Sequence, residues 1–171
     1  MTKNKIDLGL KIAIGVLMIA LAVIVIRTMD EHVVQAGDRA PDFSVTTDDG
    51  KRVSLSSFAG KPVVLHFWAS WCVPCVEEMP ALNAFTQKLA GSGVVVLGIS
   101  ADRNQAAYEK FLQSHPPQFV TAFDPTAEIS AMYGTFKFPE TYIVDRQGKV
   151  YEKFPNVADW SDDLVRKLKS L

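Results

Sequence analysis

Two continuous apolar runs with a helix-like stretch between them constrain the fold of this chain more than any other feature. The runs are "KPVVLHFW" at 61–68 and "VVVLGIS" at 94–100, and both have the length and composition of strands buried on two faces. The stretch at 74–90 reads as a helix that ends at Gly91 and Gly93. A strand, a helix and a strand in this order predict a right-handed crossover between parallel strands.

The rest of the C-terminal part continues this alternation. Residues 42–58 predict an added N-terminal β-hairpin that turns at Asp49 and Gly50. The other expected elements are helices at 104–114, 125–133 and 160–171, and a hairpin of strands at 141–145 and 150–154. The pattern predicts an α/β sandwich with a mixed central sheet, formed as one domain by residues 37–171.

The N-terminal part has the properties of a membrane anchor. Residues 8–26 carry a single charge, Lys11, and as a helix they would span about 28 Å, close to the thickness of a bilayer core. Two lysines precede the run and two acidic residues follow Arg27, so the positive-inside rule places the N-terminus in the cytoplasm. We therefore expect residues 1–36 to form a cytoplasmic N-terminus, one transmembrane helix and a linker. The protein would be a single-pass protein of the cell membrane, with its domain on the periplasmic side. The alternative is a cleaved signal peptide, since "VQA" at 34–36 resembles a cleavage site.

Charge and cysteine content exclude several classes of function. Lysine and arginine total 18 against 19 acidic residues, so the net charge of −1 predicts no nucleic-acid partner. A disulfide framework is excluded because the chain has two cysteines, and one bridge across a few residues constrains the unfolded chain very little. The cysteine pair is therefore present for chemistry or by chance.

The two cysteines stand where the first buried strand gives way to the helix, in "FWASWCVPCVEEMP" at 67–80. Cys72 is expected at the helix N-terminus, where unpaired N–H groups and the helix dipole favour a thiolate. Cys75 lies one turn deeper on the same face. This placement predicts that Cys72 is the nucleophile and that Cys75 is the resolving thiol, which closes a redox-active Cys72–Cys75 disulfide.

The chain resembles the thioredoxin superfamily in "WCVPC" after "VVLHFW", in Pro80 and in "FPETYIVD" near residue 140. More narrowly, residues 38–170 are similar to the membrane-anchored TlpA/ResA/CcmG group of thiol-disulfide oxidoreductases. The resemblance implies a thioredoxin-like fold and a disulfide reductase that needs no cofactor. It also implies client proteins with disulfides, among them apocytochrome c in cytochrome c maturation and copper-site proteins, and a membrane electron donor.

Other uses of the cysteine pair fit the sequence less well. Zinc needs four ligands, and no second pair stands at ligand spacing, so no metal site is expected. Attachment of c-type haem needs a histidine after the second cysteine, where the chain has Val76. A peroxiredoxin-like thiol peroxidase matches the N-terminal pattern "APDF", but that family has a Thr or Ser one turn before a lone peroxidatic cysteine, whereas this chain has W-C-x-x-C. A copper-delivering module of the Sco type needs wider cysteine spacing, and inert buried thiols remain the structural alternative.

Glu78 and His66 are candidates for proton transfer. Glu78 follows Cys75 by three residues and so shares its helix face, whereas Glu77 points away. The resembled group also associates this acid with its active site; the alternative is a solvated helix carboxylate. His66 precedes Cys72 by six residues, on the strand face of Val64 and Trp68, at the offset where thioredoxin has a buried Asp. It is a possible proton relay, or a core histidine with a satisfied hydrogen bond.

Three further residues are candidates for substrate binding. Pro139 matches the superfamily's cis-proline, which implies a place beside the cysteines and an extended substrate paired with the preceding backbone. The alternative is a proline at the entry of a strand. Phe138 is bulkier than the residue usually found there. Trp71 adjoins the nucleophile and offers an apolar contact surface, whereas Trp68 is expected in the core.

Two classes of function follow from these residues. The first is an extracytoplasmic oxidoreductase that reduces disulfides of specific clients. The second is a binding module, a copper chaperone or client chaperone of thioredoxin fold, that holds its ligand without turnover. The sequence names neither client nor electron donor.

Overall fold

The structure, a computed structural model, describes residues 11, 13–23 and 33–171. The chain divides between His32 and Val33 into two compact units.

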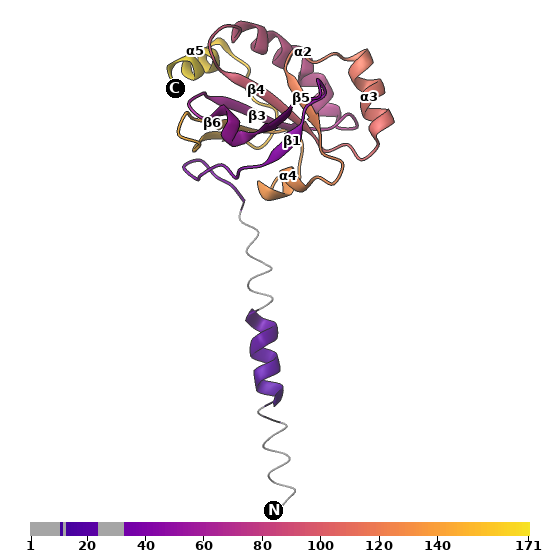
Figure 1. The fold of residues 1–171 in the computed structure, drawn as a ribbon, viewed down its shortest axis with the longest axis vertical. Helices are drawn as coiled ribbons and strands as arrows, with labels where there is room; N and C mark the ends of the chain where they lie inside the picture. Colours follow the sequence, from indigo (N-terminus) through magenta and orange to yellow (C-terminus); the bar gives the residue numbers. More distant parts are fainter. Residues whose placement is uncertain (1–10, 12, 24–32) are drawn as a thin grey trace, which may run out of the picture. The chain divides into compact units, whose positions relative to one another are not determined.

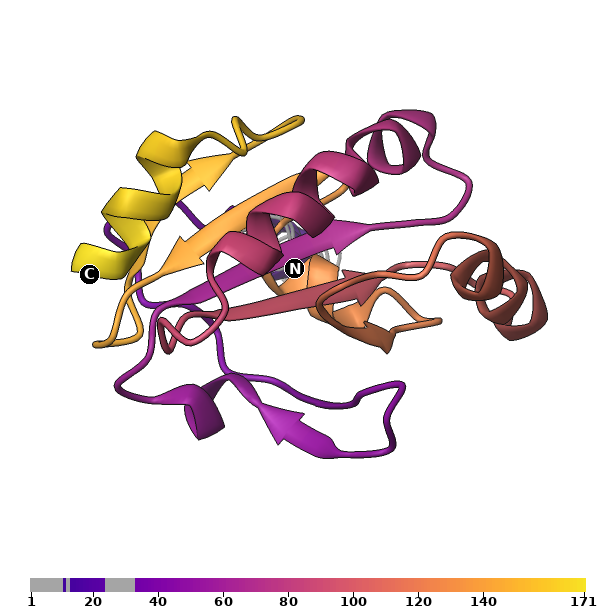
Figure 2. The same ribbon diagram turned by 90° about the horizontal axis from the view of Figure 1, so that it is seen from above.

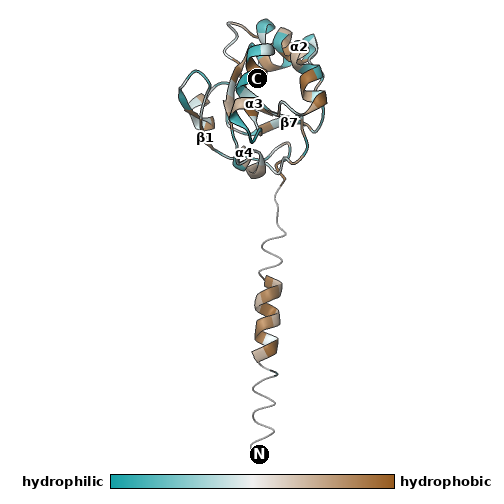
Figure 3. Ribbon diagram, turned by 90° about the vertical axis from the view of Figure 1, so that its right-hand side faces the viewer, coloured by the Kyte–Doolittle hydropathy of each residue, from teal (hydrophilic) through white to brown (hydrophobic). Residues whose placement is uncertain are grey.

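Residues 13–23 form a helix whose residues are mostly hydrophobic (Figure 3). Its large side chains, including Leu17 and Leu21, are exposed. The predicted transmembrane run of 8–26 extends over residues 8–10, 12 and 24–26, which lie outside the described residues. Within the described part of the chain, no helix is both long and apolar enough to cross a membrane.

A five-stranded mixed sheet lies at the centre of the second unit. Its order is β5-β4-β3-β6-β7. The strands are β3 (Val63–Trp68), β4 (Val95–Ser100), β5 (Val120–Phe123), β6 (Glu140–Val144) and β7 (Val150–Phe154). β3 pairs parallel with β4 and antiparallel with β6, which confirms the predicted crossover and the mixed sheet.

Helices cover one face of this sheet (Figures 1 and 2). The core of the other face is completed by one short helix and by residues of the added hairpin, which lies along the β5 edge, where Thr47 bridges to Ala122. The first layer contains α2 (Val73–Lys88), α3 (Gln105–Ser114) and α5 (Asp162–Ser170). The second contains β1 (Ser44–Thr46), β2 (Arg52–Ser54), the 3-10 helix η1 (Leu55–Phe58) and α4 (Glu128–Met132). This arrangement is the expected thioredoxin-like sandwich with an added hairpin.

Alternation along β3 divides the core between these two layers. Val64 and Trp68 belong to the cluster beneath the helices, whereas Leu65 and Phe67 belong to the cluster beneath the hairpin. All six residues of β3 are buried, as expected for a central strand covered on both faces. His66, which lies between Val64 and Trp68 in this alternation, therefore faces the helical layer.

Two elements differ from the sequence prediction. β5 was not predicted, because four residues are too few for a periodic signal and its Val120 is exposed. It forms because β4 offers it a parallel ladder. Residues 55–58 are a 3-10 helix and not part of a strand, since the Ser54 side chain accepts a hydrogen bond from the Ser57 backbone and stops the hairpin there.

The end of the predicted linker packs on the domain. Val34 is buried, its backbone N–H donates to the Tyr133 carbonyl at 3.1 Å, and its own carbonyl accepts from Lys153 Nζ at 3.2 Å. Gly37 follows with a backbone hydrogen bond to Val150. The compact unit therefore begins at Val33, four residues before the predicted boundary.

Candidate active site

Cys72 and Cys75 form a disulfide at the N-terminus of α2, with 5.3 Å between their Cα atoms. Cys72 is the N-cap residue of α2, and its sulfur accepts a hydrogen bond from the Cys75 backbone N–H at 3.3 Å. Cys72 is 5% exposed and Cys75 is 0% exposed. The pairing and the outer and inner positions are as predicted. Because a client sulfur can approach only the outer cysteine, the placement suits Cys72 for attack and Cys75 for resolution.

Asp102, which sequence reasoning missed, holds the loop that carries the cysteines. Its buried carboxylate accepts from the Ser70 backbone at 2.8 Å and from the Ser70 hydroxyl at 2.6 Å. It also accepts from the Ser100 hydroxyl at 2.6 Å. The loops after β3 and β4 are thereby joined two residues before Cys72. The sequence did contain a signal for this contact, because a polar residue follows each of two neighbouring parallel strands. The carboxyl ends of such strands meet at one edge of the sheet.

Glu78 lies on the buried face of α2 together with Cys75, as predicted, whereas Glu77 is exposed. Its residue is 5% exposed, which excludes the solvated-carboxylate alternative. Burial raises the pKa of Glu78 to about 7, against the lowering effect of hydrogen bonds from the Trp160 side chain and the Ala158 backbone. A carboxyl that titrates near neutral pH is suited to accept a proton from a neighbouring thiol.

His66 reaches the same pocket from β3. It is completely buried, and burial lowers its pKa to about 3, so the imidazole is neutral at neutral pH. Nδ1 lies 2.9 Å from the Thr141 hydroxyl on β6, and Nε2 lies 3.7 Å from Glu78 Oε1. The structure therefore brings His66 and Glu78 together, a contact that neither sequence position revealed. Residues opposite each other in strand and helix meet only after the helix has packed on the sheet.

A cavity of about 460 Å³ opens beside Glu78, between α2 and the loop before α5. Its lining includes Pro74, Glu77, Ala158, Asp159 and Trp160. This cavity gives the buried carboxyl a short route to solvent. A proton taken up by Glu78 can leave the site along it.

The Phe138–Pro139 bond is cis, as the resemblance implied. Phe138 packs into the cluster that contains both cysteines, and its ring lies 5.9 Å from that of Trp71 in an edge-on contact. The structure thus joins Trp71, next to Cys72, to Phe138, next to Pro139. Trp71 is 64% exposed, and Trp68 is buried in the core as predicted.

Two other apolar side chains near these residues in sequence are also exposed. Val73 follows Cys72 and is 65% exposed, and Phe136 precedes Phe138 by two residues and is 63% exposed. Sequence reasoning did not select either, because a Val or Phe within an apolar segment gives no sign of facing solvent. Trp71 and Val73 flank Cys72 in the chain, and large apolar residues that are exposed side by side mark contact sites.

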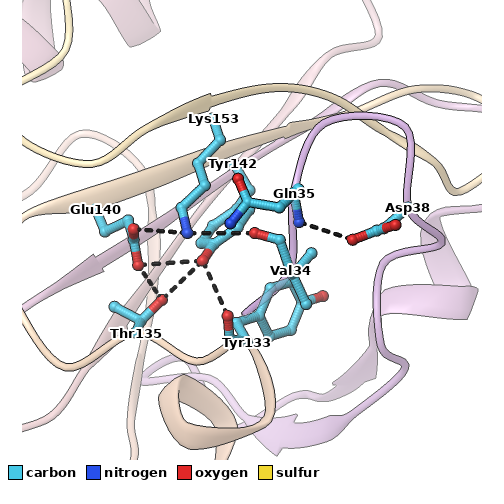
Figure 4. A network of polar contacts seen from close by, with 8 residues as sticks. All are labelled: Val34, Gln35, Asp38, Tyr133, Thr135, Glu140, Tyr142 and Lys153. Carbon is cyan, nitrogen blue, oxygen red and sulfur yellow. Dashed lines mark hydrogen bonds and ion pairs between the residues drawn. The ribbon is translucent and has the colours of Figure 1, made fainter. Parts of the chain in front are cut away.

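Glu140 directly follows Pro139 and anchors this segment in a polar network on the hairpin side of the sheet (Figure 4). Its carboxylate pairs with Lys153 at 3.0 Å and accepts hydrogen bonds from the hydroxyls of Thr135 and Tyr142. The Tyr142 hydroxyl also lies 3.1 Å from the Tyr133 carbonyl, so its one proton is shared between the two oxygens. Because Thr135 and Glu140 bracket Phe136, Phe138 and Pro139, the network fixes both ends of the segment. This role of Glu140 was not predicted.

The sequence of residues 36–153 matches the AhpC/TSA family. The chain is 36% identical over 123 residues to the thiol-disulfide oxidoreductase ResA of Bacillus thuringiensis subsp. konkukian, across 72% of this chain and 71% of that protein. It is 34% identical over 140 residues to the thiol:disulfide interchange protein DsbE of Pseudomonas fluorescens biotype C, across 79% of this chain and 76% of that protein.

Solved structures show the same likeness. A crystal structure described as a thiol:disulfide interchange protein DsbE from Chlorobium tepidum superposes with a TM-score of 0.71 at 32% identity, over 79% of this chain and 95% of that one. The position of the Cys72–Cys75 disulfide at the start of α2 is consistent with the thiol-disulfide exchange that the names of these relatives state. The chain belongs to the AhpC/TSA family, as a thiol-disulfide oxidoreductase of the ResA and DsbE type.

Proposed function

We propose that this oxidoreductase is a membrane-anchored reductant of disulfides in specific client proteins outside the cytoplasm. The observation that carries this proposal is the placement of a buried resolving cysteine, Cys75, on the same helix face as Glu78, whose pKa of about 7 equips it to accept a proton. Resolution of a mixed disulfide requires that a buried thiol lose its proton, and Glu78 supplies the base.

The reaction begins with the reduced enzyme. The Cys72 thiolate attacks one sulfur of the client disulfide, and the other client sulfur leaves as a thiolate that takes a proton from water. Cys75 then gives its proton to Glu78 and attacks the Cys72 sulfur, which releases the second client thiolate. The enzyme ends with the Cys72–Cys75 disulfide, and the client has gained two electrons and, with solvent protons, two thiols.

Client recognition is assigned to the exposed apolar side chains beside Cys72. Exposed Trp71 and Val73 flank Cys72 and offer a surface for an apolar client segment, and Phe138, which contacts Trp71 and precedes cis-Pro139, forms its wall. The clients would be proteins with accessible cysteine pairs, such as apocytochrome c in cytochrome c maturation, or copper-site proteins. The names of the ResA and DsbE relatives support thiol-disulfide exchange with other proteins.

The anchor is assigned to residues 8–26, with the domain on the periplasmic side and a membrane protein as electron donor. The exposed apolar side chains of the helix at 13–23 support this assignment. The full chain should stay with membranes through a carbonate wash, and a truncated chain that begins at Val33 should be soluble and redox-active. A mature chain in cells that begins near Gly37 would replace the anchor by a cleaved signal peptide.

The reductase assignment is tested by turnover. The chain, kept reduced by a dithiol, should reduce insulin catalytically, and Cys72→Ser should abolish this activity. Cys75→Ser should trap clients from cells as mixed disulfides through Cys72, which identifies them. Tight Cu(I) binding by the reduced chain without any disulfide turnover would contradict the proposal in favour of a copper chaperone.

A further inference from the structure

The two oxygens of the Glu78 carboxyl have different partners. Oε2 accepts a hydrogen bond from Trp160 Nε1 at 2.9 Å. Oε1 lies 3.7 Å from His66 Nε2, and neither of these two buried atoms has a hydrogen-bond partner among the residues that the structure describes. Buried polar atoms are seldom left without partners, so two of them facing each other point to an interaction that one proton completes.

The His66 ring is held so that Nε2 keeps this direction. Nδ1 lies 2.9 Å from the Thr141 hydroxyl, and the rings of Trp160 and Phe119 contact the imidazole edge-on, with centroids 5.9 Å and 6.5 Å away. Gly98, which pairs with His66 on β4, makes room for Phe119, since a Cβ there would lie 2.6 Å from its ring. The imidazole cannot turn away without disturbing this packing.

The contact with Thr141 fits either tautomer of the neutral ring, and one of the two leaves Nε2 free to accept from Glu78. A neutral imidazole carries one proton, and with that proton on Nδ1 it donates to Thr141 and leaves Nε2 as an acceptor. Protonated Glu78 is a donor. Both His66 Nε2 and Glu78 Oε1 then have a hydrogen-bond partner when the proton of Glu78 is on Oε1, because Oε2 already accepts from Trp160.

We propose a division of roles between the two oxygens of the Glu78 carboxyl: Oε2 accepts the hydrogen bond of Trp160 Nε1, and the proton on Oε1 is donated in a hydrogen bond to His66 Nε2. The proton that Cys75 gives up is thus stored between Glu78 and His66. Both are positioning residues for the base, and the inference rests on the proposed role of Glu78.

The two contacts act on Glu78 in opposite directions. The acceptor at His66 stabilises the protonated carboxyl, whereas the donor at Trp160, like the Ala158 backbone, stabilises the carboxylate. Among the residues that the structure describes, the exposed Glu77 and Asp159 line the cavity beside Glu78, and Cys75 lies on the same buried face of α2. Within the described part of the chain, no lysine or arginine lines this cavity to offset the negative charge.

Titration of Glu78 in the oxidised chain tests the division directly. The pKa of Glu78 is read from its side-chain carboxyl ¹³C signal, which is assigned by its loss in Glu78→Gln. His66→Phe should lower this pKa by about one unit and Trp160→Phe should raise it by about one unit, the size of one hydrogen bond. His66→Gln, whose amide oxygen can accept in place of Nε2, should restore most of the wild-type value.

Shifts of opposite sign in the Glu78 pKa of the two variants distinguish a positioning role from damage to the fold. A variant that merely loosens the pocket admits water and lowers the pKa of Glu78, whichever residue is changed, so two downward shifts would overturn the proposal. So would no shift in either. The ¹⁵N spectrum of the wild-type chain at pH 5 needs no variant: a proton on His66 Nδ1 and none on Nε2 supports the pairing, and a proton on Nε2 overturns it.

Kinetics distinguish this inference from the proposed function. If the shifts occur as expected but Glu78→Gln resolves mixed disulfides at the wild-type rate, the pairing stands and the base role of Glu78 fails. If Glu78→Gln is slow but the two shifts are absent, the base role stands and the pairing fails.

Discussion

The carboxylate of Asp102 holds Ser70 twice, by its backbone N–H at 2.8 Å and by its hydroxyl at 2.6 Å. The contact joins the end of β4 to the end of β3, two residues before Cys72. It fixes the loop from which α2 begins, so the position of the cysteines depends on a residue 30 positions later in the chain.

Asp102→Ala should lower the free energy of unfolding by about 3 kcal/mol, because it removes a charged acceptor and leaves the part-buried donors of Ser70 and the buried hydroxyl of Ser100 unpaired. Denaturant unfolding of the oxidised domain measures this. Asp102→Asn is the matched control, since it keeps one acceptor oxygen, and it should lose about half as much. An unchanged free energy of unfolding in the alanine variant would show that the Asp102 contact does not stabilise the fold.

In the reduced chain, Cys72 should react with iodoacetamide faster than Cys75. Cys72 caps α2, where the helix dipole favours a thiolate, and it is the more exposed of the two residues. The rates are measured on Cys75→Ser and Cys72→Ser, each with one thiol. Equal rates, or a faster Cys75, would be incompatible with the assigned roles.

Glu78→Gln should slow resolution of the mixed disulfide by roughly 10- to 10,000-fold, the range of general acid–base catalysis. Glu78 is a base only when ionised, so the wild-type rate should rise with pH through about 7 and then level off, and this step should vanish in the variant. Stopped-flow rates across pH 5–9 show both effects. A larger loss in His66→Ala than in Glu78→Gln would make His66 the base.

The raised pKa of Glu78 also predicts how stability depends on pH. The folded chain holds the proton of Glu78 up to about pH 7, whereas the unfolded chain releases it near 4.5. The folded state binds more protons in this window, so stability falls as pH rises through it, by up to about 3 kcal/mol.

Glu78→Gln should remove that loss, so its stability relative to the wild type should increase from pH 4.5 to pH 7. The lowered pKa of His66 acts in the opposite sense, since stability is lost as pH falls below about 6.5, but the variant retains it. The difference between the two denaturation curves therefore isolates Glu78. A difference that does not vary with pH would mean that the carboxyl titrates normally.

Trp71→Ala should impair reduction of protein clients and spare that of a small disulfide. The exposed indole contacts Phe138 and extends the apolar surface beside Cys72, whereas it makes no part of the proton-transfer site. With insulin the variant should show a raised KM, and with a small aromatic disulfide its kcat should match that of the wild type. Exposed Tyr151, on β7, provides a control substitution outside this surface. Equal effects on both substrates would refute a role in client binding.

The amino-acid sequence by itself determined the architecture and the identity of the reactive pair. The run 63–68 has the length and the β-branched and aromatic residues of a central strand, and the change of period after Cys72 indicates a helix, so local pattern was sufficient. The helix period also placed Glu78 on the face of Cys75, because residues three apart share a face wherever the helix packs. The sequence did not predict β5, because this strand forms by pairing with β4 and its own four residues have no strand pattern.

The tertiary structure alone decided the surroundings of these groups. His66 and Glu78, and likewise Asp102 and Ser70, are distant in sequence and meet only because helices and loops close over the sheet. Proton affinity depends on that closure: burial, and the donors and acceptors that burial brings near, set the pKa of Glu78, and the spacing of residues along the chain contains none of this information.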